Sequence, residues 1–77
     1  MTVRIRREGW EGTAKVVCQG YAGDHDQGVL VIDEGEVHER PNPVEAAIAG
    51  YEIVDASDEA IRLLLNAGYR IKGLRQG

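Results

Sequence analysis

A chain of 77 residues, 43% of them apolar and 29% charged, is one domain (1–77) close to the lower size limit for folding alone, and this composition excludes a disordered protein. A single cysteine, Cys18, excludes an internal disulfide and favours a reducing cytoplasm, and the longest apolar run is too short to cross a membrane. The net charge of −4 is unevenly spread, because residues 24–59 carry −10 whereas residues 1–23 carry +2 and residues 60–77 carry +4.

The first half of the chain has the alternating pattern of β-strands. Apolar side chains alternate with arginines in residues 2–8, and a second alternating segment covers residues 13–19. The short glycine-flanked connection between them predicts an antiparallel hairpin. The apolar residues 29–32 predict a central strand, and the pattern leaves open a polar edge strand over residues 36–40.

A short helix is predicted over residues 43–49. Asn42 is a good capping residue, and a proline at the first helical position followed by an acid resembles a capping box. We expect Val44, Ala47 and Ile48 to face inward.

The last part of the chain predicts a β-α-β unit. Strands over residues 51–54 and 69–72 flank a helix over residues 58–67, which Ser57 caps and Gly68 ends. If the two strands share a sheet they are parallel. The predicted fold is therefore α+β, with N-terminal antiparallel strands and a small mixed sheet.

The sequence carries no signature of an enzyme or of a bound cofactor. Cys18 could pair with His25 or His38 as nucleophile and base, but it lies within a strand on the face of Ala14 and Val16, where a free cysteine acts as a small apolar residue. The glycines match neither the dinucleotide fingerprint nor the P-loop. We expect no catalysis and no cofactor.

Asp24 and Asp26 are the weak candidates for a metal site. Aspartates two residues apart in a loop can converge on a hard cation. Their spacing matches no established ligand pattern, and a solvated turn explains the same residues. The sequence therefore predicts no metal ion.

The two ends of the chain supply basic residues that could share one surface. If the first and last strands are neighbours, their arginines and lysine form one basic patch, and an aromatic ring nearby could stack on single-stranded nucleic acid. The candidate contacts, called the basic set below, are Arg4, Arg6, Arg70, Lys72 and Trp10. So few bases on an acidic domain predict weak binding at physiological salt, and polar outer strand faces explain the same residues.

The acidic middle of the chain is the alternative contact surface. Carboxylates from the loop and the hairpin could gather there and dock on a basic partner, or mimic the phosphates of DNA, although solubility alone explains them as well. The residues, called the acidic set below, are Asp24, Asp26, Asp33, Glu34, Glu36 and Glu39.

Residues 53–71 resemble the C-terminal β-α-β module of short phage and prophage accessory proteins. The shared features are a strand, the helix start Ser57-Asp58-Glu59, a double leucine, and Gly68-Tyr69 leading into a last strand. The resemblance covers about a quarter of the chain and transfers no catalytic residue. It implies a mobile-element setting, as an accessory or virion-associated protein or as an inhibitor of a host defence such as an anti-CRISPR protein.

The function favoured by the sequence is therefore a non-catalytic protein-binding module that acts through the acidic set. The alternatives are a DNA-mimicking inhibitor of a host nucleic-acid enzyme and a weak binder of single-stranded nucleic acid through the basic set. We expect a protein partner rather than nucleic acid or a membrane, and an exposed strand edge would permit a homodimer.

Overall fold

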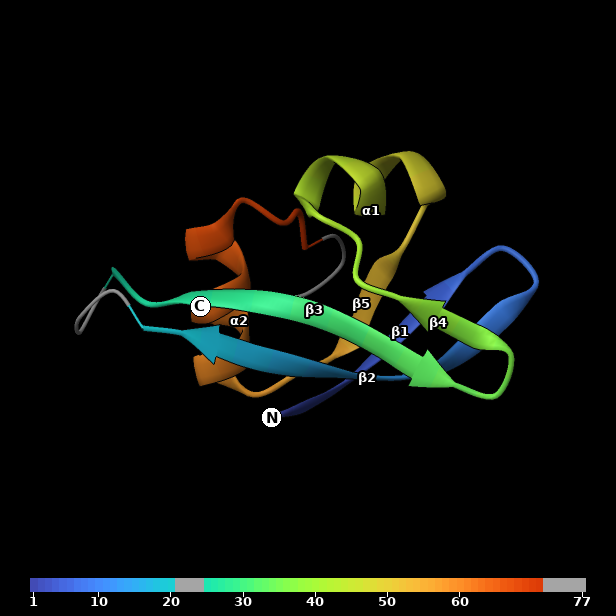
Figure 1. Cartoon of the computed structure of the whole chain (residues 1–77), viewed down its shortest axis with the longest axis horizontal. Coiled ribbons are helices and arrows are strands. Elements are labelled where there is room, and N and C mark those ends of the chain that lie inside the picture. Colours follow the sequence, from blue (N-terminus) through green and yellow to red (C-terminus); the bar gives the residue numbers. More distant parts are fainter. Residues whose placement is uncertain (21–24, 72–77) are drawn as a thin grey trace.

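A computed structural model describes residues 1–20 and 25–71, and within them it contains one curved antiparallel sheet and two helices (Figure 1). The strand order is β4-β3-β2-β1-β5, so each of the first four strands pairs with its neighbour in sequence and β5 returns to pair with β1. The elements are β1 Thr2–Arg7, β2 Trp10–Gln19, β3 Gln27–Glu34, β4 Val37–Glu39, α1 Pro43–Ala49, β5 Glu52–Asp55 and α2 Asp58–Ala67.

Local signals explain where both helices begin and end. The Asn42 side chain accepts a hydrogen bond from the Glu45 backbone N–H at 2.8 Å and donates one to the Glu45 carboxylate at 2.7 Å, which forms a capping box for α1. Ser57 caps α2 in the same way through the Ala60 N–H. Gly50 and Gly68 end the two helices with φ of 79° and 100°, in the left-handed region that favours glycine.

The hydrophobic core lies between α2 and one face of the sheet, and α1 adds to its end near β4 and β5 (Figure 1). Gly28 allows α2 to approach β3 closely, because a Cβ atom there would lie 2.6 Å from Cγ1 of Val16 and 3.1 Å from Cβ of Leu63. The most deeply buried side chains are aliphatic: Val3, Ile5, Leu30, Ile32, Leu63 and Leu64. None of the helices in the described part of the chain is long and apolar enough to cross a membrane.

The predicted α+β class is confirmed, and both helices have the predicted bounds. Within residues 1–20 and 25–71 the mixed sheet is not found, because all the strand pairs there are antiparallel. Residues 69–71 are irregular, and Lys72 lies outside the described residues. The physical reason is that Tyr69 is used as a core residue: its buried side chain donates a hydrogen bond to the Pro41 carbonyl at 2.6 Å.

Two predictions of burial are wrong. Cys18 is exposed, although it follows Ala14 and Val16 in the alternation of β2 and those two residues are buried. In α1 the buried residue is Ala46, whereas Val44 and Ile48 are 67% and 82% exposed and Ala47 is also exposed. The inward-facing residue of α1 is thus a small one, and Ala46 lines a cavity of about 20 Å³ beneath the helix together with Tyr51 and Tyr69.

Candidate interaction surface

The face of the sheet opposite α2 is open. Along β1 and β2 buried residues alternate with exposed ones, as expected where one face packs on a core and the other meets solvent. Three valines nevertheless lie on this open face: Val17 is 48% exposed, and Val29 and Val31 are half-buried. Val17 is directly opposite Val29, and Val31 is the partner of Lys15 two pairs further along the same two strands.

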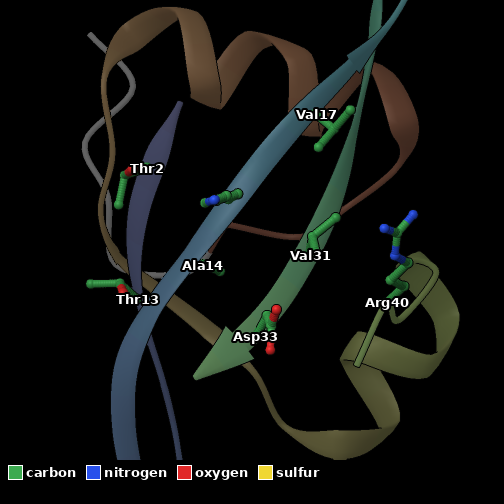
Figure 2. A pocket seen from close by; sticks show the side chains of 8 residues that line it. Thr2, Thr13, Ala14, Val17, Val31, Asp33 and Arg40 are labelled. Carbon is green, nitrogen blue, oxygen red and sulfur yellow. The ribbon is translucent and has the colours of Figure 1, made fainter. Parts of the chain in front are cut away.

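A hollow forms in the open face where β2 and β3 separate. Their pairing runs from Gln19–Gln27 to Lys15–Val31 and stops there, and the next part of β3 pairs with β4 instead, with Asp33 opposite His38. The hollow has a volume of about 390 Å³ (Figure 2). Its lining residues are Thr2, Thr13, Ala14, Lys15, Val17, Val31, Asp33 and Arg40.

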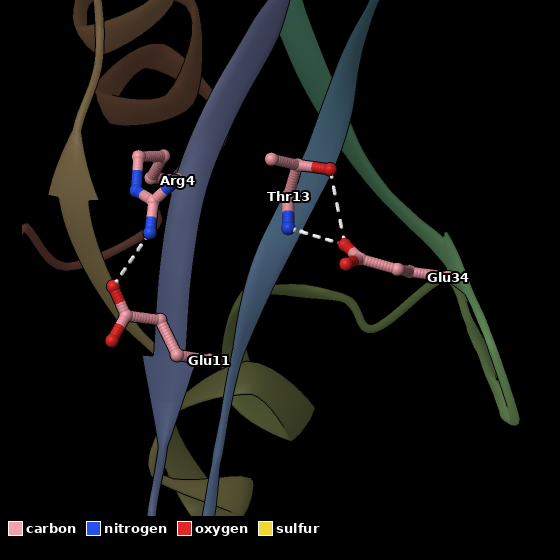
Figure 3. A network of polar contacts seen from close by, with 4 residues as sticks. All are labelled: Arg4, Glu11, Thr13 and Glu34. Carbon is pink, nitrogen blue, oxygen red and sulfur yellow. Dashed lines mark hydrogen bonds and ion pairs between the residues drawn. The ribbon is translucent and has the colours of Figure 1, made fainter.

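Glu34 ties the two strands together beside this hollow. Its Oε2 atom accepts hydrogen bonds from the backbone N–H of Thr13 and from the Thr13 hydroxyl, the latter at 3.0 Å (Figure 3). A Cβ atom on the neighbouring Gly12 would lie 2.6 Å from that same carboxylate oxygen and 2.5 Å from the Trp10 ring. Thr13 pairs with Arg4 of β1 but has no partner on β3, and glycine at position 12 leaves room for the Glu34 carboxylate to take that place.

Ion pairs neutralise two cations of the open face. Arg4 contacts Glu11 at 2.9 Å (Figure 3), and Arg6 contacts Glu52 at 3.0 Å. Both pairs are exposed, so each contributes little to stability, but each removes a positive charge from the surface. The positive charges of Arg4 and Arg6 are thus neutralised by carboxylates of β2 and β5, and only the pairing of β1 with β5 was not predicted from the sequence.

The other members of the basic set do not join Arg4 and Arg6. Arg70 lines a separate hollow of about 140 Å³ with Ala47 and Gly50. Trp10 is half-buried and packs edge-on against Tyr51, with 6.3 Å between ring centroids. Lys72 lies outside the described residues. The single basic patch required the first strand to pair with the strand predicted over residues 69–72. In the structure β1 pairs with β2 and β5 instead.

Most of the acidic set lies near the β3–β4 hairpin, but on different sides of it. Asp33 is on the open face and pairs with His38, whereas Glu34 is bound to Thr13. Glu36 is exposed in the turn between the strands. Glu39 accepts a hydrogen bond from the Tyr51 hydroxyl and lies 3.7 Å from a guanidinium nitrogen of Arg7.

The remaining described acid of the set lies at the opposite end of β3. Asp26 directly precedes β3, and its backbone carbonyl accepts a hydrogen bond from the Asn66 side chain at 2.9 Å. Asp24 lies outside the described residues. Among residues 1–20 and 25–71, no three His, Cys, Asp or Glu side chains converge as metal ligands would.

A cluster around Tyr51 joins elements that are distant in sequence. The Arg7 guanidinium lies 5.1 Å from the centre of the Tyr51 ring, and the Tyr51 hydroxyl donates to Glu39. Burial and this hydrogen bond to a carboxylate raise the pKa of Tyr51 to about 12. Arg7, Glu39 and Tyr51 contact one another, so the cluster connects β1, β4 and the residue that precedes β5.

The site residues predicted from the sequence do not include four residues that line the hollow of the open face, namely Lys15, Val17, Val31 and Arg40. The signal for Lys15 and Val17 was present, because alternation placed both on the outer side of the strand predicted over residues 13–19. Arg40 reaches the same hollow only because the turn between β3 and β4 brings the end of β4 back alongside β3.

Comparison of the chain with protein-family models, with curated proteins and with solved structures finds no match. The assignment of function therefore depends on the surface described above.

Proposed function

We propose that this chain is a non-catalytic protein-binding module and that the open face of the sheet is its contact surface. The observation that supports this most directly is the cluster of Val17, Val29 and Val31 on the uncovered face. Single exposed apolar residues are ordinary in soluble proteins, whereas neighbouring ones beside a hollow are typical of interaction sites.

This proposal moves the contact surface away from the acidic set expected from the sequence. Two members of that set, Glu34 and Glu39, hold strands and side chains of the protein itself together. They are therefore less free to receive a partner than the valines of the open face, which have no polar contacts to lose. A mobile-element origin, whether as an accessory protein or as an inhibitor of a host defence, stays a prediction from the resemblance of residues 53–71.

Photo-crosslinking in the source organism tests the contact surface. A benzophenone amino acid at Val17 should yield one discrete crosslinked protein, because this side chain lies at the centre of the proposed contact. The same amino acid at Glu36 tests the acidic set, and at Glu59, an exposed residue of α2, it serves as the matched control. A crosslink at Glu36 or Glu59 and none at Val17 would refute the proposal.

The captured protein, once purified, provides the quantitative test. Val17→Asp should weaken its binding by about tenfold or more, since a charge would then be buried against an apolar contact. The circular dichroism spectrum should not change, because Val17 faces solvent in the free chain. Unaltered binding by this variant would also contradict the proposal.

A further inference from the structure

We propose that the hollow between β2 and β3 binds a carboxylate of the partner protein, presented beside an aliphatic side chain, and that Lys15 and Arg40 are the residues that recognise it. This inference rests on the proposed function and specifies the chemistry of the partner. Its basis is the charge and shape of the hollow's lining.

Among the described residues, Lys15 and Arg40 differ from most other cations in having no carboxylate partner. Arg4, Arg6, Arg7 and Arg62 each lie within 4 Å of an acidic side chain. In the described part of the chain, neither Lys15 nor Arg40 forms an ion pair, and both line the same hollow. In a protein with 13 acids and 9 bases, two unpaired cations at one hollow mark a local positive site.

The other polar groups of the hollow reinforce this preference. Asp33 is the acid in the lining, and it is already paired with His38. The carboxylate of Glu34 is likewise occupied by the two donors of Thr13. The hydroxyl of Thr2 adds a group that can donate a hydrogen bond to an incoming oxygen. A carboxylate can therefore meet unpaired donors without first displacing a bound acid.

The apolar part of the lining favours a protein over a nucleic acid. Val17 and Val31, diagonal neighbours on β2 and β3, both line the hollow (Figure 2), where an aliphatic side chain next to the carboxylate would contact them. Sequence-independent binders of single-stranded nucleic acid place aromatic rings beside their cations. The described aromatic residues, Trp10, Tyr51 and Tyr69, instead pack with the core, and none of them lines this hollow.

Titration of the isotope-labelled protein with three probes tests the inference by NMR. The probes are the blocked peptides Ac-Ser-Glu-Val-Glu-Val-Ser-NH₂ and Ac-Ser-Gln-Val-Gln-Val-Ser-NH₂ and a six-nucleotide oligothymidine. The acidic peptide should shift the amide signals of Lys15, Val17 and Val31, and its affinity should fall as salt rises from 50 to 300 mM, because exposed charges are screened. The glutamine peptide and the oligonucleotide should bind at least about fivefold more weakly.

Two charge-removing variants provide the matched comparison. The double variant Lys15→Gln/Arg40→Gln should weaken the acidic peptide by about fivefold or more, whereas Arg4→Gln, which removes a paired cation from the same face, should change affinity by less than about twofold. Equal binding of both peptides, stronger binding of the oligonucleotide, or equal effects of the two variants would each overturn the inference. If the acidic peptide fails but Val17 still crosslinks to a partner, the carboxylate assignment falls and the proposed function stands; if the crosslink fails as well, both fall.

Discussion

At the scale of single residues, two tyrosine hydroxyls connect distant parts of the chain. Tyr69 donates to the Pro41 carbonyl and accepts a hydrogen bond from the Leu30 backbone N–H at 3.3 Å. Only residues 32–34 of β3 pair with β4, and the Tyr69 hydroxyl occupies the backbone N–H of Leu30 on the part of that edge that β4 leaves uncovered. An uncovered edge could otherwise pair with a strand of another molecule. A homodimer formed through a strand edge would have to use another edge, such as that of β5, and it stays a prediction.

The second tyrosine, Tyr51, makes stability depend on pH in the alkaline range. Its pKa is about 12 in the folded protein, against an ordinary value of about 10 in the unfolded chain. Below pH 10 both states keep the proton and the stabilisation is complete. Between these two pKa values only the unfolded state loses its proton, so the free energy of unfolding should fall as pH rises, by at most about 1.4 kcal/mol per pH unit from this residue.

Urea unfolding at pH 9, 10 and 11 measures this dependence. Burial also raises the pKa of Tyr69, so some slope should persist without Tyr51. Tyr51→Phe should therefore give a flatter dependence than the original chain rather than none. Identical slopes for the two proteins would show that the Tyr51 hydroxyl is not held by Glu39 as described.

At the scale of elements, α1 and α2 are both well capped but differ in what holds them. α2 buries Ala60, Leu63 and Leu64 against the sheet, whereas α1 buries Ala46 and leaves Val44 and Ile48 in solvent. The prediction for α1 was wrong because apolar residues at helical spacing in a seven-residue segment identify an apolar stripe but do not show whether another element covers it.

Truncation of one aliphatic side chain in each helix should separate the two cases. Leu64→Ala should lower the free energy of unfolding by about 2–5 kcal/mol, because it leaves a cavity under α2. Ile48→Ala should change it by less than about 0.5 kcal/mol, because the side chain is mostly in solvent. Chemical denaturation of both variants measures the difference, and a large loss in Ile48→Ala would mean that α1 packs its apolar stripe inward after all.

At the scale of the whole molecule, contacts between sequence-distant elements join the two ends of the chain. β1 pairs with both β2 and β5, and Trp10 contacts Tyr51 across the same region. Trp10 is the only tryptophan in the sequence, so its fluorescence reports whether the N-terminal hairpin and the start of β5 remain in contact. The core is likewise shared by β1, β2, β3, β5 and both helices.

Unfolding should therefore occur as one transition. The midpoints of urea unfolding followed by Trp10 fluorescence and by far-ultraviolet circular dichroism should coincide, as they do for small cooperative domains. A fluorescence transition at distinctly lower urea would show that β5 separates from the hairpin before the rest of the fold is lost.

Local chemistry in the sequence was sufficient to locate the elements. The bounds of both helices follow from Asn42, Ser57 and the two closing glycines, because capping acts between residues three or four positions apart. Strands β1 and β2 follow from alternation along single segments, and the apolar run over residues 29–32 predicted β3. The strand predicted over residues 69–72 is wrong for residues 69–71, which are irregular. The α+β class and the absence of a long apolar segment are likewise contained in the sequence alone.

Only the tertiary structure decided which residues meet across the sheet. Arg6 and Glu52 are separated by 46 positions, and their ion pair exists because β5 returns to β1 rather than joining a parallel pair. The hollow that brings Lys15 and Arg40 together depends in the same way on the point where β2 and β3 separate. Strand order reflects the packing of the whole core, so the open face, with its valines and unpaired cations, could not be read from patterns that extend over a few residues.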